Sequence, residues 1–212
     1  MEIISGLAKD GLLILNCDDP LLRQAGRELI AAGTCRVGFV SAQGPCEEPG
    51  AELCLYASRI EPTDSAVAFD ANLQTESVRL ETQQETAVRV TIPAPGRHQV
   101  INGLFGLICA RALGLTAAEA AAGAAGYQNT GSRQRIKRID TLTVLDDSYN
   151  ASPESMAAAL QTLQALAAPG NNRKLAALGG MLELGGFSAE AHTRVGRAAA
   201  AAGLTELFLI GD

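Results

Sequence analysis

Apolar and polar residues alternate in blocks over the first forty positions. Residues 11–17 (GLLILNC) and 36–40 (RVGFV) are short apolar runs. Between them, leucine and alanine recur every three or four positions in residues 20–32, directly after an aspartate that can cap a helix and a proline that suits its first turn. The pattern predicts strand, helix and strand, which is typical of a parallel sheet covered by helices.

The pattern shortens to a period of two between residues 52 and 92. Residues 77–81 (SVRLE) and 87–92 (AVRVTI) alternate on either side of a polar turn and predict an antiparallel hairpin, so the sheet is expected to be mixed. Residues 98–113 are apolar almost all round and predict a buried helix. Thr116 and Glu119 form a capping-box pattern for the next helix, to about residue 125.

The last third of the chain repeats the strand and helix pattern. Residues 141–145 predict a buried strand, and Ser152-Pro153-Glu154 predicts the start of a helix. Residues 174–178, 188–202 and 207–210 predict one β-α-β unit. The expected fold class is therefore α/β: a mixed, mainly parallel sheet with flanking helices, followed by a partial Rossmann-like β-α-β unit.

Composition excludes several classes of function. The net charge of −6 argues against a nucleic-acid partner or an anionic membrane surface. No apolar run approaches the roughly 20 residues of a membrane span, and the start of the chain lacks a signal-peptide pattern, so a cytoplasmic location is expected. Five cysteines without a C-x-x-C pair, and only two histidines, predict reduced thiols and no metal site.

Two polar groups suggest a nucleotide site. His98 and Asn102 share one face of the predicted helix, and Gly103 and Gly106 beside them leave room for a flat ligand. The Asn102 amide offers the donor and acceptor that an adenine edge needs; the alternative is that both residues satisfy local backbone. Arg133, in TGSRQR, has the planar fork that suits phosphate oxygens, or is a solvated loop residue.

A third group follows the predicted strand 141–145 in the sequence DDSYNASPES (146–155). An acid at the carboxyl end of a strand is well placed to bind a ribose hydroxyl, and the following helix start can receive an anion. The alternative is ordinary turn and cap chemistry for the acids Asp146 and Asp147.

The order of these motifs resembles the Mur ligase family, the ATP-dependent amide-forming enzymes of peptidoglycan synthesis. The similar segments are LNCDDP (15–20), PGRHQVINGLFGLICARALG (95–114), TGSRQ (130–134), DDSYNASPESM (146–156) and LGGMLELGGFSAEAHTRVG (178–196). The resemblance implies that residues 1–149 are the second part of the family's central ATPase domain, without its P-loop. Residues 150–212 would then be the first part of the C-terminal domain.

The resemblance also implies roles for individual residues. Asn102 corresponds to the adenine contact, His98 to its neighbour at the helix start, Arg133 to an arginine near the ATP phosphates, and Asp147 to the ribose-binding acid. Tyr149 and Asn150 would lie at the domain junction near the ligands. ATP and Mg²⁺ are the implied cofactors. The DDSYNASPESM segment is most similar to the branch that joins D-alanyl-D-alanine to UDP-N-acetylmuramoyl-tripeptide through an acyl phosphate.

The chain departs from the family in one important respect. No Gly-Lys dipeptide, and hence no phosphate-binding loop, occurs in the 212 residues, and the family's metal-binding acid and histidine segment is also missing. We therefore expect a fragment that is inactive alone. The alternatives are a related amide ligase, such as a folylpolyglutamate or cyanophycin synthetase, against which the Tyr149-Asn150-Ala151 run argues, and a non-catalytic α/β binding module.

Overall fold

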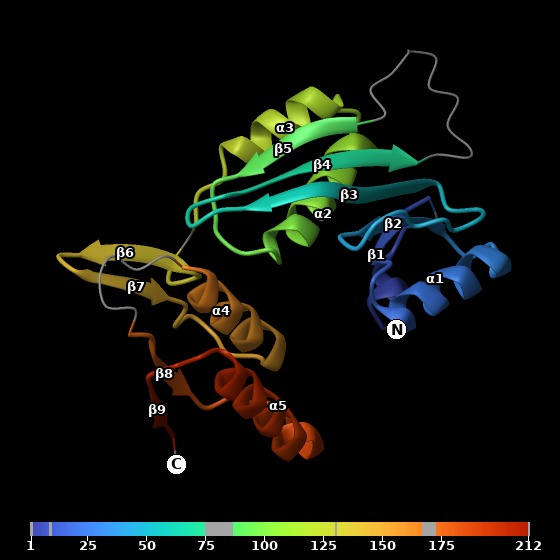
Figure 1. Cartoon of the computed structure of the whole chain (residues 1–212). Helices are drawn as coiled ribbons and strands as arrows, with labels where there is room; N and C mark the ends of the chain where they lie inside the picture. Colours follow the sequence, from blue (N-terminus) through green and yellow to red (C-terminus); the bar gives the residue numbers. More distant parts are fainter. Residues whose placement is uncertain (1, 9, 75–86, 130, 167–172, 212) are drawn as a thin grey trace. The chain divides into compact units, whose positions relative to one another are not determined.

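The computed structural model describes residues 2–8, 10–74, 87–129, 131–166 and 173–211, and it divides into two compact units (Figure 1). The first unit comprises Met1–Glu61, Val67–Pro93 and His98–Tyr127. The second comprises Gln128–Asp212 together with the short segments Pro62–Ala66 and Ala94–Arg97. Residue 149, the predicted family domain boundary, lies inside the second unit. Among the described helices, none combines the length and apolarity that crossing a bilayer requires.

The first unit is built on a five-stranded sheet in the order β1-β2-β3-β4-β5. The strands β1, β2 and β3 pair in parallel, whereas β4 and β5 pair antiparallel. Their bounds are Leu12–Asn16 (β1), Arg36–Ser41 (β2), Leu53–Pro62 (β3), Val67–Gln74 (β4) and Ala87–Ile92 (β5). The predicted mixed sheet is confirmed. The proposed hairpin strand at residues 77–81 lies outside the described residues, and β4 is the partner of β5.

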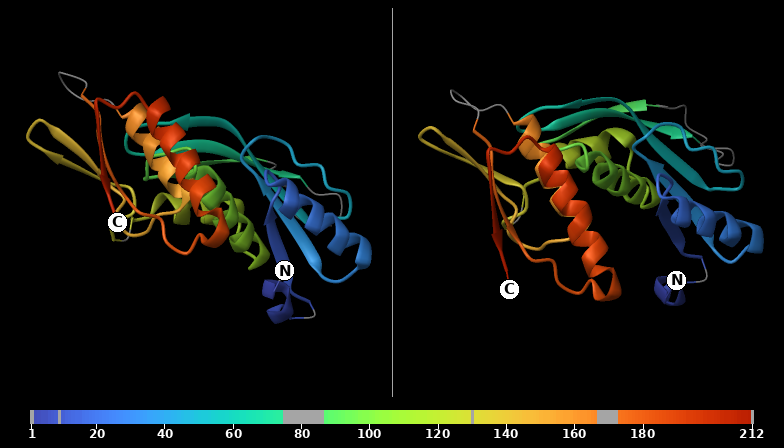
Figure 2. Two further views of the ribbon diagram at one scale, coloured as in Figure 1. Left: turned by 90° about the horizontal axis from the view of Figure 1, so that it is seen from below. Right: turned by 60° about the horizontal axis from the view of Figure 1, so that its bottom comes forward.

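Helices lie on both faces of the parallel part of this sheet, where Figure 2 shows a blue helix on one side of the blue strands and a green helix on the other. Successive side chains of a strand point to opposite faces, so neighbouring residues of β2 meet different helices. A Cβ atom at Gly26 of α1 (Pro20–Ala32) would lie 2.3 Å from the ring of Phe39. A Cβ atom at Gly38 would lie 3.2 Å from Ile108 of α2 (Gln99–Ala112). The helices α1 and α2 therefore pack on opposite faces of β2.

Local capping chemistry sets where the helices begin. The Asp19 carboxylate accepts hydrogen bonds from the backbone N–H groups of Leu21 (2.8 Å) and Leu22 (3.0 Å), which confirms the predicted start of α1. Thr116 and Glu119 form the predicted capping box of α3 (Ala117–Ala125). A 3-10 helix, η1 (Glu2–Gly6), precedes β1.

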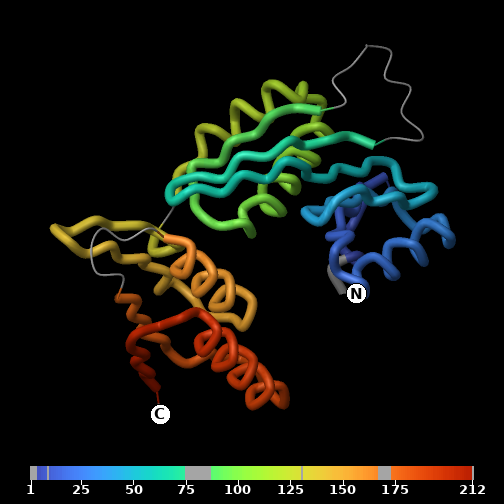
Figure 3. Tube along the Cα trace, viewed as in Figure 1, coloured from blue at the N-terminus to red at the C-terminus, as the bar shows by residue number. Residues whose placement is uncertain are grey.

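The second unit contains two small sheets and two helices, which Figure 3 traces from yellow to red. The strands β6 and β7 form an antiparallel hairpin. The strands β8 and β9, which α5 connects along the chain, pair with each other in parallel. The apolar core includes Met156 and Leu160 of α4 and Val195 of α5. The bounds are Arg135–Ile139 (β6), Leu142–Asp146 (β7), Pro153–Ala165 (α4), Leu175–Gly179 (β8), Gly185–Phe187 (η2), Ser188–Ala201 (α5) and Glu206–Ile210 (β9).

The strand predicted at residues 141–145 is present, but the prediction that it is buried was wrong. Within β7, Leu142 is 62% exposed and Val144 is 39% exposed. The reason is that, among the described residues, no helix packs extensively against the hairpin of β6 and β7, and four of the five residues of β6 (RIKRI) are exposed as well. Apolar β-branched residues favour strand backbone in either setting, whereas burial depends on what packs against the strand.

Candidate functional site

The six predicted site residues, four for nucleotide binding and two for the domain junction, are divided between the two units. The first unit contributes His98 and Asn102. The second contributes Arg133, Asp147, Tyr149 and Asn150.

In the second unit, three of these residues are brought together where β7 ends. Asp147 Oδ1 accepts a hydrogen bond of 3.0 Å from the backbone N–H of Gln134. The backbone N–H of Tyr149 donates to the carbonyl oxygen of Ser132 at 3.2 Å. The guanidinium carbon of Arg133 lies 4.3 Å from the centroid of the Tyr149 ring, a cation–π arrangement. The segments 132–134 and 147–149 are thus joined by one hydrogen bond to a side-chain carboxylate, one backbone–backbone hydrogen bond and one stacked pair.

The structure distinguishes the two adjacent acids, which the sequence did not. Asp146 Oδ2 accepts a hydrogen bond from Lys137 at 2.8 Å, and its Oδ1 accepts from the Ser148 hydroxyl. The bonds from Lys137 and Ser148 lower the pKa of the Asp146 carboxyl below its usual range. Asp146 is therefore engaged by its own hairpin. Asp147 bonds instead to the backbone beside Arg133, which makes it the better candidate for a ligand contact.

Gln134 is a residue of this group that sequence reasoning missed. It is buried and has a φ of 47°, in the left-handed region that few non-glycine residues adopt. Its side-chain oxygen accepts a hydrogen bond from Thr162 Oγ1 of α4 at 3.5 Å. Glutamine carries no sequence signal for such a backbone conformation, so only the fold reveals that Gln134 supports the loop next to Arg133.

Asn150 does not join the group. Its Oδ1 accepts a hydrogen bond of 2.8 Å from the backbone N–H of the next residue, Ala151, and its side chain is exposed. This is local turn chemistry.

In the first unit, His98 and Asn102 lie at the start of α2. His98 occupies the N-cap position and is half-buried, without a side-chain capping bond. Asn102 is exposed, and its Nδ2 donates to Gln99 Oε1 at 3.2 Å. The prediction that Gly103 leaves room for a ligand was wrong, because a Cβ atom there would lie 2.5 Å from Ile92 and 3.1 Å from Phe69. Gly103 lets α2 approach its own sheet, whereas Gly106 has open space beside it.

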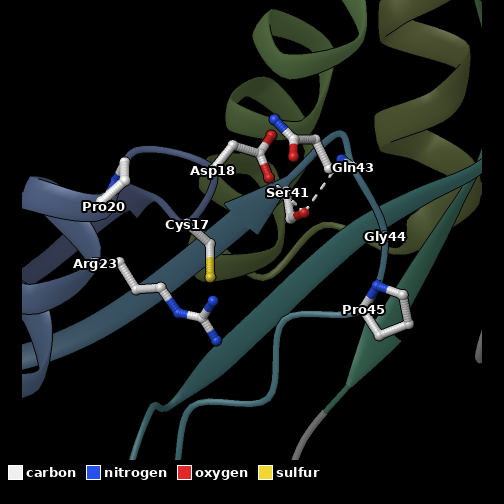
Figure 4. Close-up of a pocket in the computed structure, with 8 residues that line it drawn as sticks. All are labelled: Cys17, Asp18, Pro20, Arg23, Ser41, Gln43, Gly44 and Pro45. Carbon is white, nitrogen blue, oxygen red and sulfur yellow. Dashed lines mark hydrogen bonds between the residues drawn. The ribbon is translucent and has the colours of Figure 1, made fainter.

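A cavity of about 320 Å³ lies where the parallel strands β1 and β2 end, and no sequence argument predicted it (Figure 4). The Asp18 carboxylate accepts hydrogen bonds from the Ser41 hydroxyl (2.7 Å) and from the backbone N–H of Ala42 (2.8 Å). Parallel sheets place ligands beyond such strand ends. The sequence signal for this site was the extra acid in LNCDDP. Asp19 caps α1, so the cap does not explain Asp18, whose carboxylate ties the loop after β2. The lining residues are Cys17, Asp18, Pro20, Arg23, Ser41, Gln43, Gly44 and Pro45.

The expectation that all cysteines are reduced thiols was wrong, because Cys17 and Cys46 form a disulfide. The fold brings together two residues separated by 29 positions, one following β1 and one in the loop after β2. Glu48 lies beside them, and one ligand atom from each of these three residues falls within 4.8 Å of the others. This trio does not fit a metal ion, since the sulfur atoms are bonded to each other and two arginines hold the carboxylate.

Glu48 makes the stability of the first unit depend on pH. Its side chain is fully buried and pairs with Arg23 and Arg27. Burial disfavours the charged form, but the hydrogen bonds from Arg27 and Arg23 outweigh it and lower the pKa of Glu48. The stabilisation is therefore present above the unfolded-state pKa, about 4.3, and is lost as pH falls through the lower folded-state pKa.

We expect Glu48→Gln to remove about 1–3 kcal/mol at pH 7 and to flatten the fall in stability between pH 5 and pH 2. Urea unfolding across this pH range measures both effects. The neighbouring exposed Glu47→Gln is the matched control. An unchanged pH profile in Glu48→Gln contradicts the assignment.

Comparison with known proteins agrees with this architecture. Residues 133–212 match the family model described as "Mur ligase, glutamate ligase domain". Two relatives named UDP-N-acetylmuramoyl-tripeptide–D-alanyl-D-alanine ligase align with essentially the whole chain. The protein from Bacillus subtilis is 29% identical over 216 residues, which is 100% of this chain and 40% of the relative. The protein from Escherichia coli is 32% identical over 213 residues, which is 99% of this chain and 42% of the relative.

Solved structures show the same similarity. A crystal structure of MurF from Acinetobacter baumannii superposes with a TM-score of 0.78 at 25% identity, covering 100% of this chain and 41% of that one. MurF from Thermotoga maritima, solved in complex with ADP, has the same fold, with a TM-score of 0.69 at 21% identity, over 100% of this chain and 47% of that one.

Over the stretch that it shares with these proteins, the chain belongs to the Mur ligase family, as its motifs predict. Within the family, the curated relatives reported above carry the name of the D-alanyl-D-alanine-adding ligase. The chain spans about 40% of the length of these relatives.

Proposed function

We propose that this chain is the nucleotide-binding part of an ATP-dependent ligase that joins D-alanyl-D-alanine to UDP-N-acetylmuramoyl-tripeptide. The observation that carries the proposal is the joining of Arg133, Asp147 and Tyr149 at the end of β7, inside a segment that matches the family model. The names of the relatives support the substrates. The ADP bound to the Thermotoga maritima protein supports the nucleotide.

The proposed roles follow the chemistry of each side chain. Asp147 Oδ1 accepts a hydrogen bond from the backbone N–H of Gln134, so Oδ2 is the atom proposed to accept a hydrogen bond from a ribose hydroxyl. Arg133, stacked on Tyr149, presents its guanidinium edge to phosphate oxygens while the ring holds its plane. Asn102 contacts the adenine edge with its amide oxygen, and His98 orients the start of α2 beside it. Tyr149 and Asn150 are proposed to lie near the ligands, at the junction of the family's central and C-terminal domains.

In the complete ligase, the tripeptide carboxylate takes up the γ-phosphoryl group of ATP. The amine of D-alanyl-D-alanine then attacks the acyl phosphate, and ADP and phosphate leave. Mg²⁺ would neutralise charge on the phosphates. We assign no Mg²⁺ ligand in this chain. We also propose that residues 1–149 and 150–212 correspond to the family's central and C-terminal domains.

The full product of the gene that contains this sequence tests the proposal. We expect it to release ADP and form the pentapeptide product only when ATP, UDP-N-acetylmuramoyl-tripeptide and D-alanyl-D-alanine are all present. We expect no ligation by the 212 residues alone, since they contain no Gly-Lys phosphate loop. Product formation with a single amino acid in place of the dipeptide, but not with the dipeptide, would refute the proposed substrate.

Substitutions at the β7 end test the proposed roles in the same assay. Arg133→Ala and Asp147→Asn should each raise KM for ATP about 10- to 100-fold, the loss typical of one hydrogen bond to a charged group. Asp147→Asn keeps an oxygen acceptor for the backbone N–H of Gln134, so it tests the effect of the negative charge alone. The exposed Arg138→Ala, in the same hairpin, is the control. An equal rise in KM for Arg138→Ala would mean that hairpin charge, not a specific contact, is responsible.

A further inference from the structure

The Cys17–Cys46 disulfide cross-links the carboxyl edge of the sheet in the first unit. Cys17 directly follows β1, and Cys46 lies in the loop that follows β2. Both residues are buried, with 6% and 2% of their surfaces exposed. The loop is also tied at its start, where Ala42 donates its N–H to Asp18. The disulfide is therefore one of several ties on this loop, together with the Asp18 bond at its start and the pairing of Glu48 with Arg23 and Arg27 of α1.

The surroundings favour reversible chemistry at this bond. The fully buried Glu48 carboxylate lies next to the two sulfur atoms and carries two arginine partners, Arg23 and Arg27. With Asp18, which lines the same cavity as Cys17, the two guanidinium groups face two carboxylates, so the charges around the bond balance. Arg23 lines the cavity together with Cys17, and a guanidinium beside a sulfur atom stabilises the thiolate, which is both the attacking and the leaving form in thiol–disulfide exchange.

The two sulfur atoms differ in access. Cys17 lines the cavity of about 320 Å³ at the strand ends, together with Asp18, Arg23 and Ser41, whereas Cys46 is not among its lining residues (Figure 4). A small thiol that enters the cavity thus meets Cys17 first. The remaining cysteines form no disulfide: Cys35 is half-buried, Cys54 is buried and Cys109 is exposed.

We propose that Cys17 and Cys46 form a reversible thiol–disulfide site, with small thiols such as glutathione as its substrates, and that its redox state sets the shape of the cavity at the ends of β1 and β2. Disulfides that occur in reducing compartments are usually transient or redox-sensing. Both cysteines belong to the buried cluster around Phe39, and Cys17 also lines the cavity, which gives a small thiol a route to the bond. The inference does not depend on the ligase function.

The exchange is balanced with two glutathione molecules. The first thiolate attacks Cys17 Sγ, the Cys17–Cys46 bond breaks, and Cys46 leaves as a thiolate. The second glutathione thiolate attacks the glutathione sulfur of the mixed disulfide, which releases Cys17 and glutathione disulfide. Two electrons pass to the protein, and the two protons of the glutathione thiols end on the cysteines.

The test equilibrates the purified chain in glutathione buffers of graded ratio, followed by acid quenching, alkylation and peptide mass spectrometry. We expect Cys17 and Cys46 to change together from protected to alkylated as the buffer becomes more reducing, while Cys109 is alkylated or forms only mixed disulfides. Hydrogen exchange of the amides in residues 43–47 should accelerate at least about tenfold on reduction, since a local tie is lost. A trapped intermediate should carry glutathione on Cys17.

Two variants sharpen the result. In Cys46→Ser, the amides of residues 43–47 should show the fast hydrogen exchange of the reduced form at every glutathione ratio. Cys109→Ser should behave as the unmodified chain. If Cys46→Ser does not fold, the oxidised and reduced forms of the unmodified chain still supply the comparison. Three results would each overturn the proposal: alkylation of Cys17 and Cys46 at the most oxidising ratio, equal rates of hydrogen exchange in both redox states, or glutathione trapped on Cys46.

Discussion

Replacing Phe39 with alanine should lower the free energy of unfolding of the first unit by about 3–5 kcal/mol, the range seen for large-to-small changes in closed cores. Phe39 lies in β2 with no exposed surface, in a cluster with Leu15, Val37 and Cys54. Its ring fills the space where a side chain at Gly26 of α1 would begin. The paired strands β1 and β3 flank the site and α1 packs over it, so the cavity left by the ring has little freedom to collapse. Urea unfolding monitored by hydrogen exchange reports the first unit separately.

Two comparisons make this prediction specific. Phe187→Ala removes a ring that is 75% exposed and should change stability by less than about 0.5 kcal/mol. Gly26→Ala alone should destabilise the unit, because its Cβ atom would lie 2.3 Å from the Phe39 ring. Combined with Phe39→Leu, which withdraws that ring, Gly26→Ala should cost less than it does alone. Strictly additive effects would show that the two residues do not contact each other.

The elements that the sequence predicted best are those set by local chemistry. The cap at Asp19 followed by Pro20 defines the start of α1, and Thr116 with Glu119 defines the start of α3, because both depend on residues within one turn. The strand at residues 142–146 was also predictable from β propensity. Its exposure was not, because that depends on whether another element packs over the hairpin of β6 and β7.

The candidate site shows the same limit. The sequence predicted that an acid at the end of β7 could contact a ligand. Which of the two acids, Asp146 or Asp147, has that position depends on which one faces Lys137 across the hairpin. Gly103 suggested space for a ligand, whereas the space is occupied by Ile92 of β5 and Phe69 of β4. Contacts of this kind follow from sheet register, which a single sequence does not specify. The cysteine pairing is the clearest case, since nothing local relates positions 17 and 46.

Reduction of the Cys17–Cys46 disulfide should lower the free energy of unfolding of the first unit by about 3–4 kcal/mol, the chain-entropy value for a closed loop of this size. The bond joins residues 29 positions apart, and the enclosed segment contains all of α1 and β2. Cutting it enlarges the unfolded ensemble, while Asp18 and Glu48 keep their partners in the folded state. The loss should therefore arise mainly in the unfolded chain. Urea unfolding with and without dithiothreitol measures it.

The second unit supplies an internal control for this experiment, because none of the five cysteines lies in it. Its unfolding midpoint, followed by hydrogen exchange of α4 and α5, should not respond to dithiothreitol. The double variant Cys17→Ser/Cys46→Ser should match the reduced chain and be insensitive to the reductant, whereas Cys109→Ser should retain the full response. A loss below about 1 kcal/mol on reduction would contradict the entropic account, and it would mean that Glu48 and its two arginines hold the loop without help from the disulfide.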